Sequence, residues 1–251
     1  MYYTTGLYRA NISELCTMIR DATANIKKPW PPSLGLHKSV VITLTYLRRN
    51  RVQQELAETY DVSQPTVSRA IKEITLLLGK VLRPYVPTAE ELDAEASYIV
   101  DGTLLPCWSW ASCKELYSGK HKTTGMNVQV ACTLTGHLAW ISDPIAGHRN
   151  DTYCLRESGL LDILDPARTM GDKGYVGNRM ITSIKKLPKR ELLDWQKEFN
   201  TQVNKIRYVI EQVIANFKTW RIMHTDYRRP LNTFTDTIST VIALHFYKLA
   251  E

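Results

Sequence analysis

The sequence predicts a mixed α/β protein in which an all-α N-terminal module precedes a domain built on a central mixed sheet. Up to about residue 85, apolar residues recur at three- and four-residue spacing, which is typical of helices. Residues 83–95 then combine two prolines with an acidic run, as a connector between domains would. Beyond this connector, short apolar runs alternate with turn residues. We therefore expect a helical domain over residues 1–90 and an α/β domain over residues 91–251.

Four apolar runs in the second domain end at turn signals and predict strands. The run SYIVDG reads as a buried strand that meets a turn at Asp101. MNVQVACTLT and HLAWISDPIAG are joined at Gly136, which predicts a tight hairpin. ARTMGDKGY predicts another strand, which ends at Asp172 before a glycine turn. The two aspartates are thus expected at strand ends.

The remaining segments of the second domain favour helices. Residues 151–164 have helical spacing, and either Asn150 or Asp151 could serve as the N-cap. A weak strand is expected at residues 179–186, after which the chain should be mostly helical to its end. These segments would supply the helices that cover the sheet.

Charge favours a polyanionic partner such as nucleic acid. Lys and Arg number 32 against 25 Asp and Glu, a net charge of +7. Residues 179–229 alone hold twelve basic and five acidic residues, which equals the surplus of the whole chain. On this ground alone, a solvated helical face explains the excess equally well.

Cysteine usage and apolar patterning point to a cytoplasmic protein. The five cysteines are scattered and form no C-x-x-C pair, so we expect most of them in the core. The first residues lack the pattern of a signal peptide, and no apolar run approaches the ~20 residues of a membrane span. No membrane partner is expected.

A helix-turn-helix is predicted at about residues 52–80. A short helix breaks at residues 60–62, and Ser63 and Pro65 suit the start of a second helix. The residues expected to pack the pair are Leu56, Ala57, Val62, Val67 and Ile71; those expected to face a DNA groove are Gln64, Thr66, Ser68 and Arg69. Arg48, Arg49 and Arg51, just before this segment, could neutralise phosphates. The alternative is a purely structural helical hairpin.

Three acidic residues stand out as candidate metal ligands. Asp101 and Asp172 each follow an apolar strand, and Glu211 lies in an apolar-periodic helix. Carboxylates at adjacent strand ends and on a covering helix can converge on Mg²⁺, and two such ions ~4 Å apart promote in-line displacement at phosphorus. Taken singly, each aspartate could be a turn residue and the glutamate a solvated one.

The helix around Glu211 carries two kinds of stripe. Arg207 and Lys218 share a helical face with Glu211, an arrangement that suits phosphate clamping or ordinary salt bridging. A separate apolar stripe is expected to pack on the sheet: Ile206, Ile210, Val213, Ile214 and Phe217.

Taken together, these motifs resemble a known family. DGT at Asp101, YSGKHKTTGMNVQV, GHRND, GDKGY at Asp172 and R-x-x-x-E-x-x-x-x-x-x-K from Arg207 look like insertion-sequence transposases of the IS-five type, related to Harbinger transposases. The resemblance covers nearly the whole chain, including the helix-turn-helix. The family's tyrosine three residues before Arg207 is replaced here by Asn204, which places a phosphate contact from that position in doubt.

The resemblance implies a ribonuclease H-like domain with Asp101, Asp172 and Glu211 as its catalytic triad. It also implies Mg²⁺ or Mn²⁺ as cofactor, in two ions, and double-stranded DNA as substrate, cut at the ends of a mobile element and joined to a target. Arg207 and Lys218 match basic positions of the family, and a dimer or higher oligomer on DNA is expected in the bacterial nucleoid. A small-molecule substrate is not expected. The alternatives are a DNA-binding regulator without catalysis and a site-specific nuclease that cuts without joining.

Several further residues are weaker candidates. Asp151, in GHRND, could assist metal binding or cap the following helix. Lys120, His121 and Lys122 could touch phosphates or be solvated, and a lone His148 suggests no zinc site. One tryptophan could stack on a base, although core packing is the simpler reading for most of them: Trp108, Trp110, Trp140, Trp195 and Trp220.

Overall fold

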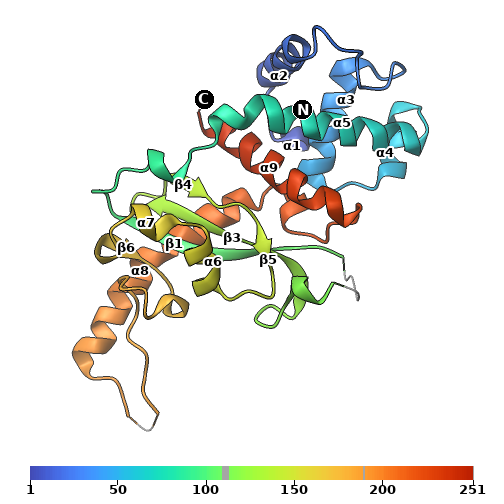
Figure 1. Cartoon of the computed structure of the whole chain (residues 1–251). Coiled ribbons are helices and arrows are strands. Elements are labelled where there is room, and N and C mark those ends of the chain that lie inside the picture. The colour runs from blue at the N-terminus through green and yellow to red at the C-terminus, as the bar shows by residue number, and fades with distance from the viewer. Residues whose placement is uncertain (109–112, 189, 251) are drawn as a thin grey trace. The chain divides into compact units, whose positions relative to one another are not determined.

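A computed structural model of the chain describes residues 1–108, 113–188 and 190–250. The chain forms two compact units (Figure 1). A helical unit comprises residues 1–86 and 218–251, and a sheet unit comprises residues 87–217. Among the described residues, none of the helices has the length and apolar character needed to cross a bilayer.

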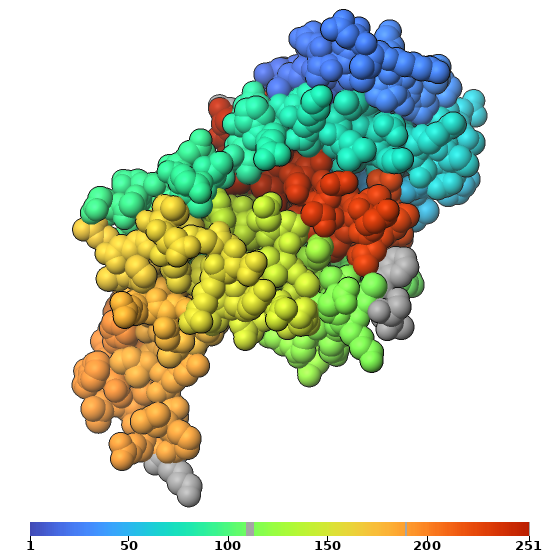
Figure 2. Space-filling model, viewed as in Figure 1, coloured from blue at the N-terminus to red at the C-terminus, as the bar shows by residue number. Residues whose placement is uncertain are grey.

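The helical unit is built around a long amphipathic helix. Its helices are α1 Tyr2–Thr5, α2 Arg9–Ala22, α3 Gly35–Arg49, α4 Gln53–Tyr60, α5 Gln64–Leu82 and α9 Phe234–Leu249. Every third or fourth residue of α5 is buried, from Val67 through Ile71 and Ile74 to Leu78, as the predicted spacing requires. Helix α9 lies along α5, where the Thr240 hydroxyl donates to the Thr75 carbonyl at 3.0 Å. In the space-filling view, the red C-terminal residues adjoin the blue-green residues of α5 (Figure 2).

The C-terminal helix therefore packs differently from the sequence-based expectation. We expected residues 91–251 to form one domain, whereas residues 218–251 belong to the helical unit. The reason is that α9 is apolar around nearly its whole circumference. Such a helix requires burial on several sides, and α5 presents a long apolar face to it.

The sheet unit has a mixed sheet, as predicted. Its strands are β1 Tyr98–Pro106, β2 Tyr117–Ser118, β3 Thr123–Thr133, β4 Leu138–Ile141, β5 Ile145–Ala146 and β6 Thr169–Met170. The strand order is β2-β3-β1-β6, and β4 and β5 also pair with β3. Strand β1 is antiparallel to β3 and parallel to β6. The hairpin between β3 and β4 turns at Gly136, whose φ of 86° is readily adopted only by glycine.

Helices cover both faces of this sheet. Helices α6 Asp151–Glu157 and α7 Leu160–Ile163 lie on one face, and α8 Asp194–Phe217 passes behind the other (Figure 1). On the α6 face, Val100 and Trp140 pack with Leu155 and Leu160 in a common apolar cluster. Because strand residues alternate between faces, neighbours of Val100 on β1 point toward α8.

Two local expectations were wrong. Strand β1 does not end at Asp101 but continues through Gly102 to Pro106, because its apolar residues resume at Leu104. The weak strand expected at residues 179–186 reduces to a single bridge between Met170 and Ile181.

Candidate active site

Two of the predicted carboxylates lie side by side on the sheet. Tyr98 and Ile99 of β1 are paired with Thr169 and Met170 of β6. Continuing this parallel register by two residues places Asp172 beside Asp101, on the same face. Asp101 is held within β1, and Asp172 begins a short helical turn by accepting a hydrogen bond from the Lys173 amide at 2.6 Å. The central strands therefore position both side chains.

An arginine from α8 bridges these two carboxylates. The Arg207 guanidinium lies 3.6 Å from an Asp101 carboxylate oxygen and 3.3 Å from one of Asp172. Only 13% of the Arg207 side chain is exposed, so it faces the sheet in the stripe that Val203 and Ile210 also occupy. Our expected apolar stripe was wrong at Ile206, which is 39% exposed, because Arg207 takes the sheet-facing place to reach the carboxylates.

Burial makes the charge of Asp101 costly. Loss of solvent around Asp101 raises its pKa to about 6. Arg207 and a hydrogen bond of 2.9 Å from the Gly102 amide counteract this shift, while the neighbouring Asp172 adds to it. The Nε atom of Arg207 is buried without a hydrogen-bond partner in the described part of the chain. The charge of Arg207 therefore does not fully offset the burial of Asp101, and among the described residues Arg207 keeps one N–H donor without an acceptor.

Glu211 lies on the same helix but outside this cluster. It follows Arg207 by one turn of α8 and is exposed, and its side chain forms no ion pair or hydrogen bond with any described residue. Accordingly, no group of three His, Cys, Asp or Glu side chains within the described ranges is close enough to hold a metal ion. The structure brings Asp101 and Asp172 together and leaves Glu211 exposed on α8.

The donor chemistry at Asp101 and Asp172 nevertheless fits a hard divalent cation. Two carboxylates on adjacent strands supply the oxygen ligands that Mg²⁺ and Mn²⁺ prefer. The raised pKa of Asp101 shows that its present cationic neighbours do not fully offset its burial. A nearby cation would stabilise the ionised form of Asp101.

Asp151 points into the other face of the sheet. It is not the N-cap of α6, because the Asn150 side chain accepts from the Tyr153 amide at 2.8 Å. Its carboxylate instead accepts from Lys120 Nζ at 2.7 Å and from Asn127 Nδ2 at 3.3 Å. The capping role considered for Asp151 was therefore wrong, and its carboxylate is part of a polar network.

That network was missed by sequence reasoning. Gln129 Nε2 donates to Asn127 Oδ1 at 3.1 Å, and the Tyr175 hydroxyl donates to Gln129 Oε1 at 2.7 Å. All three side chains are buried. The sequence MNVQVACT did indicate this network. Asn127 and Gln129 lie on one face of an otherwise apolar strand, and buried amides at these positions require hydrogen-bond partners.

Lys120 links the two faces electrostatically. Burial opposes its positive charge, yet the ion pair with Asp151 and the charges of Asp101 and Asp172 raise the pKa of Lys120. Lys122, the other predicted basic contact in this hairpin, is exposed with a φ of 55°. Lys120 is therefore a cation that is paired with Asp151 and also attracted by the charges of Asp101 and Asp172.

The helix-turn-helix is formed by α4 and α5. Asp61 adopts a left-handed conformation at the break, and Ser63 is the N-cap of α5. Of the four residues predicted to face DNA, Arg69 is exposed and Gln64 and Ser68 are half-buried. Thr66 was wrongly placed on that surface: it is 8% exposed, and its hydroxyl contacts Ser63 at 2.9 Å and accepts from Arg69 at 3.3 Å. The buried Thr66 hydroxyl thus orients the exposed Arg69 side chain through this hydrogen bond.

Other predicted residues have simpler placements. Lys218 directly follows α8 in the helical unit, where burial lowers its pKa. His148 contacts the Glu115 carbonyl. Trp140 and Trp220 are buried, Trp108 and Trp195 are exposed, and Trp110 lies outside the described residues. Four of the five cysteines are buried, as expected.

Comparison with known proteins identifies the class to which this fold and site belong. Residues 100–245 match the family model described as DDE superfamily endonuclease, and residues 32–84 match the helix-turn-helix of DDE superfamily endonuclease. The chain therefore belongs to the DDE superfamily endonucleases. The first match contains Asp101, Asp172 and Glu211, and the second contains α3, α4 and α5.

Two curated relatives span most of their own length and of this chain. One, from Streptomyces albus G, is described as "putative transposase for insertion sequence element IS112" and is 29% identical over 87% of this chain and 83% of its own length. The other, from Microchaete diplosiphon, is described as "probable transposase for insertion sequence element IS702" and is 24% identical over 98% and 93%. No solved structure matches the chain.

Proposed function

We propose that the chain is an insertion-sequence transposase that binds the ends of its element, cuts them and joins them to target DNA. The observation that carries this proposal is the pairing of Asp101 with Asp172 on one sheet face, bridged by Arg207, in a member of the DDE endonucleases that also has a helix-turn-helix. The names of its relatives point to the same activity.

In this proposal, Asp101, Asp172 and Glu211 hold two Mg²⁺ or Mn²⁺ ions. When bound, such ions activate the attacking hydroxyl or water and stabilise the leaving oxygen at phosphorus. A change of rotamer on α8 would turn the exposed Glu211 carboxylate toward the paired aspartates, because one helical turn separates it from Arg207. Asp151 is a less direct candidate, since it lies on the opposite face and is engaged by Lys120.

The basic side chains of the sheet unit would bind the scissile phosphate. Arg207 offers further N–H donors to a phosphate once a metal neutralises the aspartates. Lys120 lies within electrostatic reach of the same carboxylates, and Lys122 follows it on the exposed hairpin. Together these three side chains would orient the DNA backbone for in-line attack. Lys218, which belongs to the helical unit, is proposed as a separate contact to the DNA backbone.

The helix-turn-helix would recognise the terminal repeats of the element. Arg69, Gln64 and Ser68 on α5 are the accessible side chains for base or phosphate contacts. Because two element ends must be processed together, we propose that two or more copies assemble on DNA.

A cleavage assay separates this function from its alternatives. Purified protein is incubated with Mg²⁺ and a duplex that carries the inverted repeats flanking its gene, and the products are sequenced. We expect cut ends and joined products from the wild type and neither from Asp172→Asn, with DNA binding retained. Asp162→Asn, an exposed aspartate of α7, is the control and should cut normally.

Other results would favour the alternatives. Tight binding without cutting under any divalent ion would identify a DNA-binding regulator. Cut ends without joined products would identify a nuclease, and normal cutting by Asp172→Asn would contradict the role given to that residue.

A further inference from the structure

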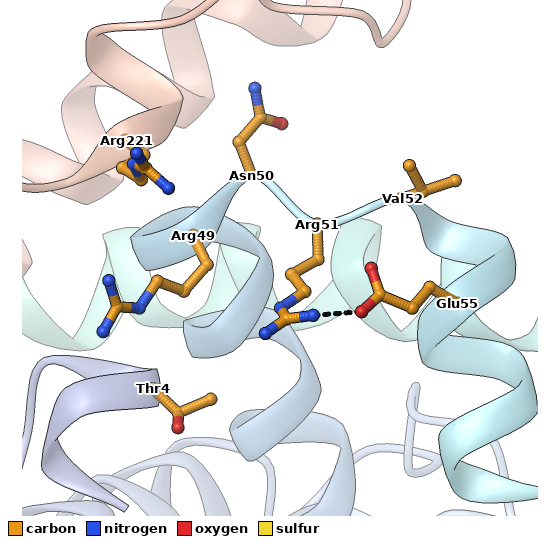
Figure 3. Close-up of a pocket in the computed structure, with 7 residues that line it drawn as sticks. All are labelled: Thr4, Arg49, Asn50, Arg51, Val52, Glu55 and Arg221. Carbon is orange, nitrogen blue, oxygen red and sulfur yellow. Dashed lines mark hydrogen bonds and ion pairs between the residues drawn. The ribbon is translucent and has the colours of Figure 1, made fainter.

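The turn between α3 and α4 lies between two adjoining pockets lined by arginines, which we call the arginine pockets. The larger, of about 400 Å³, is lined by Thr4, Arg49, Asn50, Arg51, Val52, Glu55 and Arg221 (Figure 3). The smaller, of about 170 Å³, is lined by Tyr46, Arg51, Val52, Gln53, Arg228 and Arg229. Arg51 and Val52 line both pockets. All of these residues belong to the helical unit.

The C-terminal segment supplies three of the five arginines of this surface. Arg221, Arg228 and Arg229 precede α9 and are brought to the α3–α4 turn by direct hydrogen bonds. Asn50 Nδ2 donates to the Thr225 hydroxyl at 2.6 Å, and the Arg228 guanidinium donates to the Asn50 carbonyl at 3.1 Å. Hydrogen bonds between the C-terminal segment and the α3–α4 turn therefore hold these arginines close together.

The environment of Arg229 is the strongest indication that the smaller pocket binds a ligand. It is only 8% exposed, yet it forms no hydrogen bond or ion pair with any described residue. The other charged residues of its pocket are Arg51 and Arg228, and the adjacent Tyr46 phenol is neutral because burial raises its pKa. The guanidinium of this largely buried side chain therefore opens on a pocket that holds other cations, which favours an anion there.

The start of α4 adds further donors to the same place. Its N-cap is Val52, which provides no side-chain acceptor, so the amides of the first turn have no cap. These amides and the positive end of the helix dipole favour an anion next to Gln53, which lines the smaller pocket.

The charges and sizes of the pockets indicate which anion fits. The smaller pocket holds three arginines and no acidic side chain, and its volume is below the ~300 to 1,000 Å³ of small-molecule sites. The larger holds three arginines and Glu55, which is already paired with Arg51, as the dashed line in Figure 3 marks. Planar guanidinium groups match the oxygens of a phosphate.

We infer that the arginine pockets bind successive backbone phosphates of the DNA duplex that α5 reads. This inference rests on the proposed function and deepens it, because it makes the segment 221–229 part of the DNA-binding surface. Phosphate contacts of this kind fix the position of a recognition helix without reading sequence.

The test measures affinity of the full-length chain for two duplexes, one with the element's end and one of unrelated sequence, by fluorescence anisotropy over a range of salt concentrations. Arg221→Gln and Arg229→Gln should each weaken binding to both duplexes by about tenfold. Each should also reduce the slope of log affinity against log salt by about one. Arg20→Gln, an exposed arginine of α2 that lines neither pocket, is the control and should bind as the wild type does.

Folding is controlled separately, because Arg229 is buried. Arg229→Lys retains the charge and should keep the wild-type salt slope, and Arg221→Gln changes only an exposed side chain. A wild type that binds and cuts DNA while Arg221→Gln and Arg229→Gln match Arg20→Gln would overturn this inference and leave the proposed function intact. A wild type that binds no duplex would overturn both.

Two further outcomes would also count against the pockets as DNA sites. A loss confined to the element's end would show that these arginines read bases. Thermal stabilisation by inorganic phosphate that Arg221→Gln abolishes, with DNA affinity unchanged, would assign the pockets to a free anion.

Discussion

Burial shifts the pKa of single ionisable groups in both units, upward for an acid and downward for a base. It raises the pKa of Asp101 to about 6 and lowers the pKa of His245 to about 4, because in each case the charged form loses hydration. For Asp101 a nearby cation can compensate for this loss. For His245, inside α9, the charged neighbours are Lys248 and Arg48, which lower the pKa further.

His245 should therefore make the stability of the helical unit depend on pH. Its folded-state pKa lies below its ordinary value of 6.5, so the stabilising contribution is full above pH 6.5 and is lost as pH falls toward 4. The free energy of unfolding should fall by up to ~3 kcal/mol over this interval. Urea unfolding followed by circular dichroism measures it.

A variant pair isolates this effect. His245→Asn should flatten the pH dependence, whereas His224→Asn, an exposed histidine of the same unit, should leave it unchanged. Equal slopes for wild type and His245→Asn would exclude His245 as the cause.

At the scale of elements, β1 is the strand on which both sides of the site depend. Asp101 faces α8 and Arg207, and the next residue, Gly102, faces the network of Asp151, Asn127 and Gln129. A Cβ at Gly102 would lie 2.8 Å from Gln129 Nε2 and 3.0 Å from Asp151 Oδ1. The glycine is therefore needed for close approach rather than for a turn.

Gly102→Ala should destabilise the sheet unit by about 1–3 kcal/mol, because the buried amide network must shift to admit a methyl group. Gly119→Ala is the matched control, since nothing lies within 4 Å of its Cβ position. Urea unfolding of both variants provides the comparison. Equal stabilities would show that the network yields to the methyl group at no cost.

The sequence predicted an element correctly where local spacing determines its structure, and incorrectly where distant residues determine which side chains are buried. The helix-turn-helix, the Gly136 hairpin and the mixed sheet follow from local spacing and turn residues, and they were predicted and confirmed. The side of α8 that faces the sheet was not predicted correctly. Apolar spacing favours Ile206 at this position, whereas Arg207 is buried there because it pairs with Asp101 and Asp172. Thr66 was misplaced for a similar reason, because its buried hydroxyl contacts the Ser63 N-cap and Arg69 rather than DNA-facing solvent.

At the scale of the whole molecule, the helical unit is discontinuous in sequence. Its core combines α5 with α9, whose buried residues include Phe234, Ile238 and Val241. The sheet unit is inserted between them. The spacing of apolar residues could not predict this discontinuous unit, because it shows that a helix has an apolar face but not which distant helix covers that face.

A fragment of residues 1–90 should consequently fail to fold cooperatively, since removal of α9 exposes the apolar face of α5. Joining residues 218–251 to it through a flexible linker should restore a cooperative transition, measured by thermal unfolding. A fragment 1–90 that unfolds cooperatively at the same midpoint as the linked form would contradict the proposed role of α9.

The central claim is that Asp101, Asp172 and Glu211 share divalent metal. The most direct measurement is a Mn²⁺ titration of the full-length chain, followed by electron paramagnetic resonance. We expect Asp101→Asn, Asp172→Asn and Glu211→Gln each to lower Mn²⁺ affinity by at least about tenfold. The control, Glu198→Gln on the same helix, should bind as the wild type does. Wild-type Mn²⁺ affinity in Glu211→Gln would contradict the claim, because the exposed glutamate of α8 would then take no part in the site.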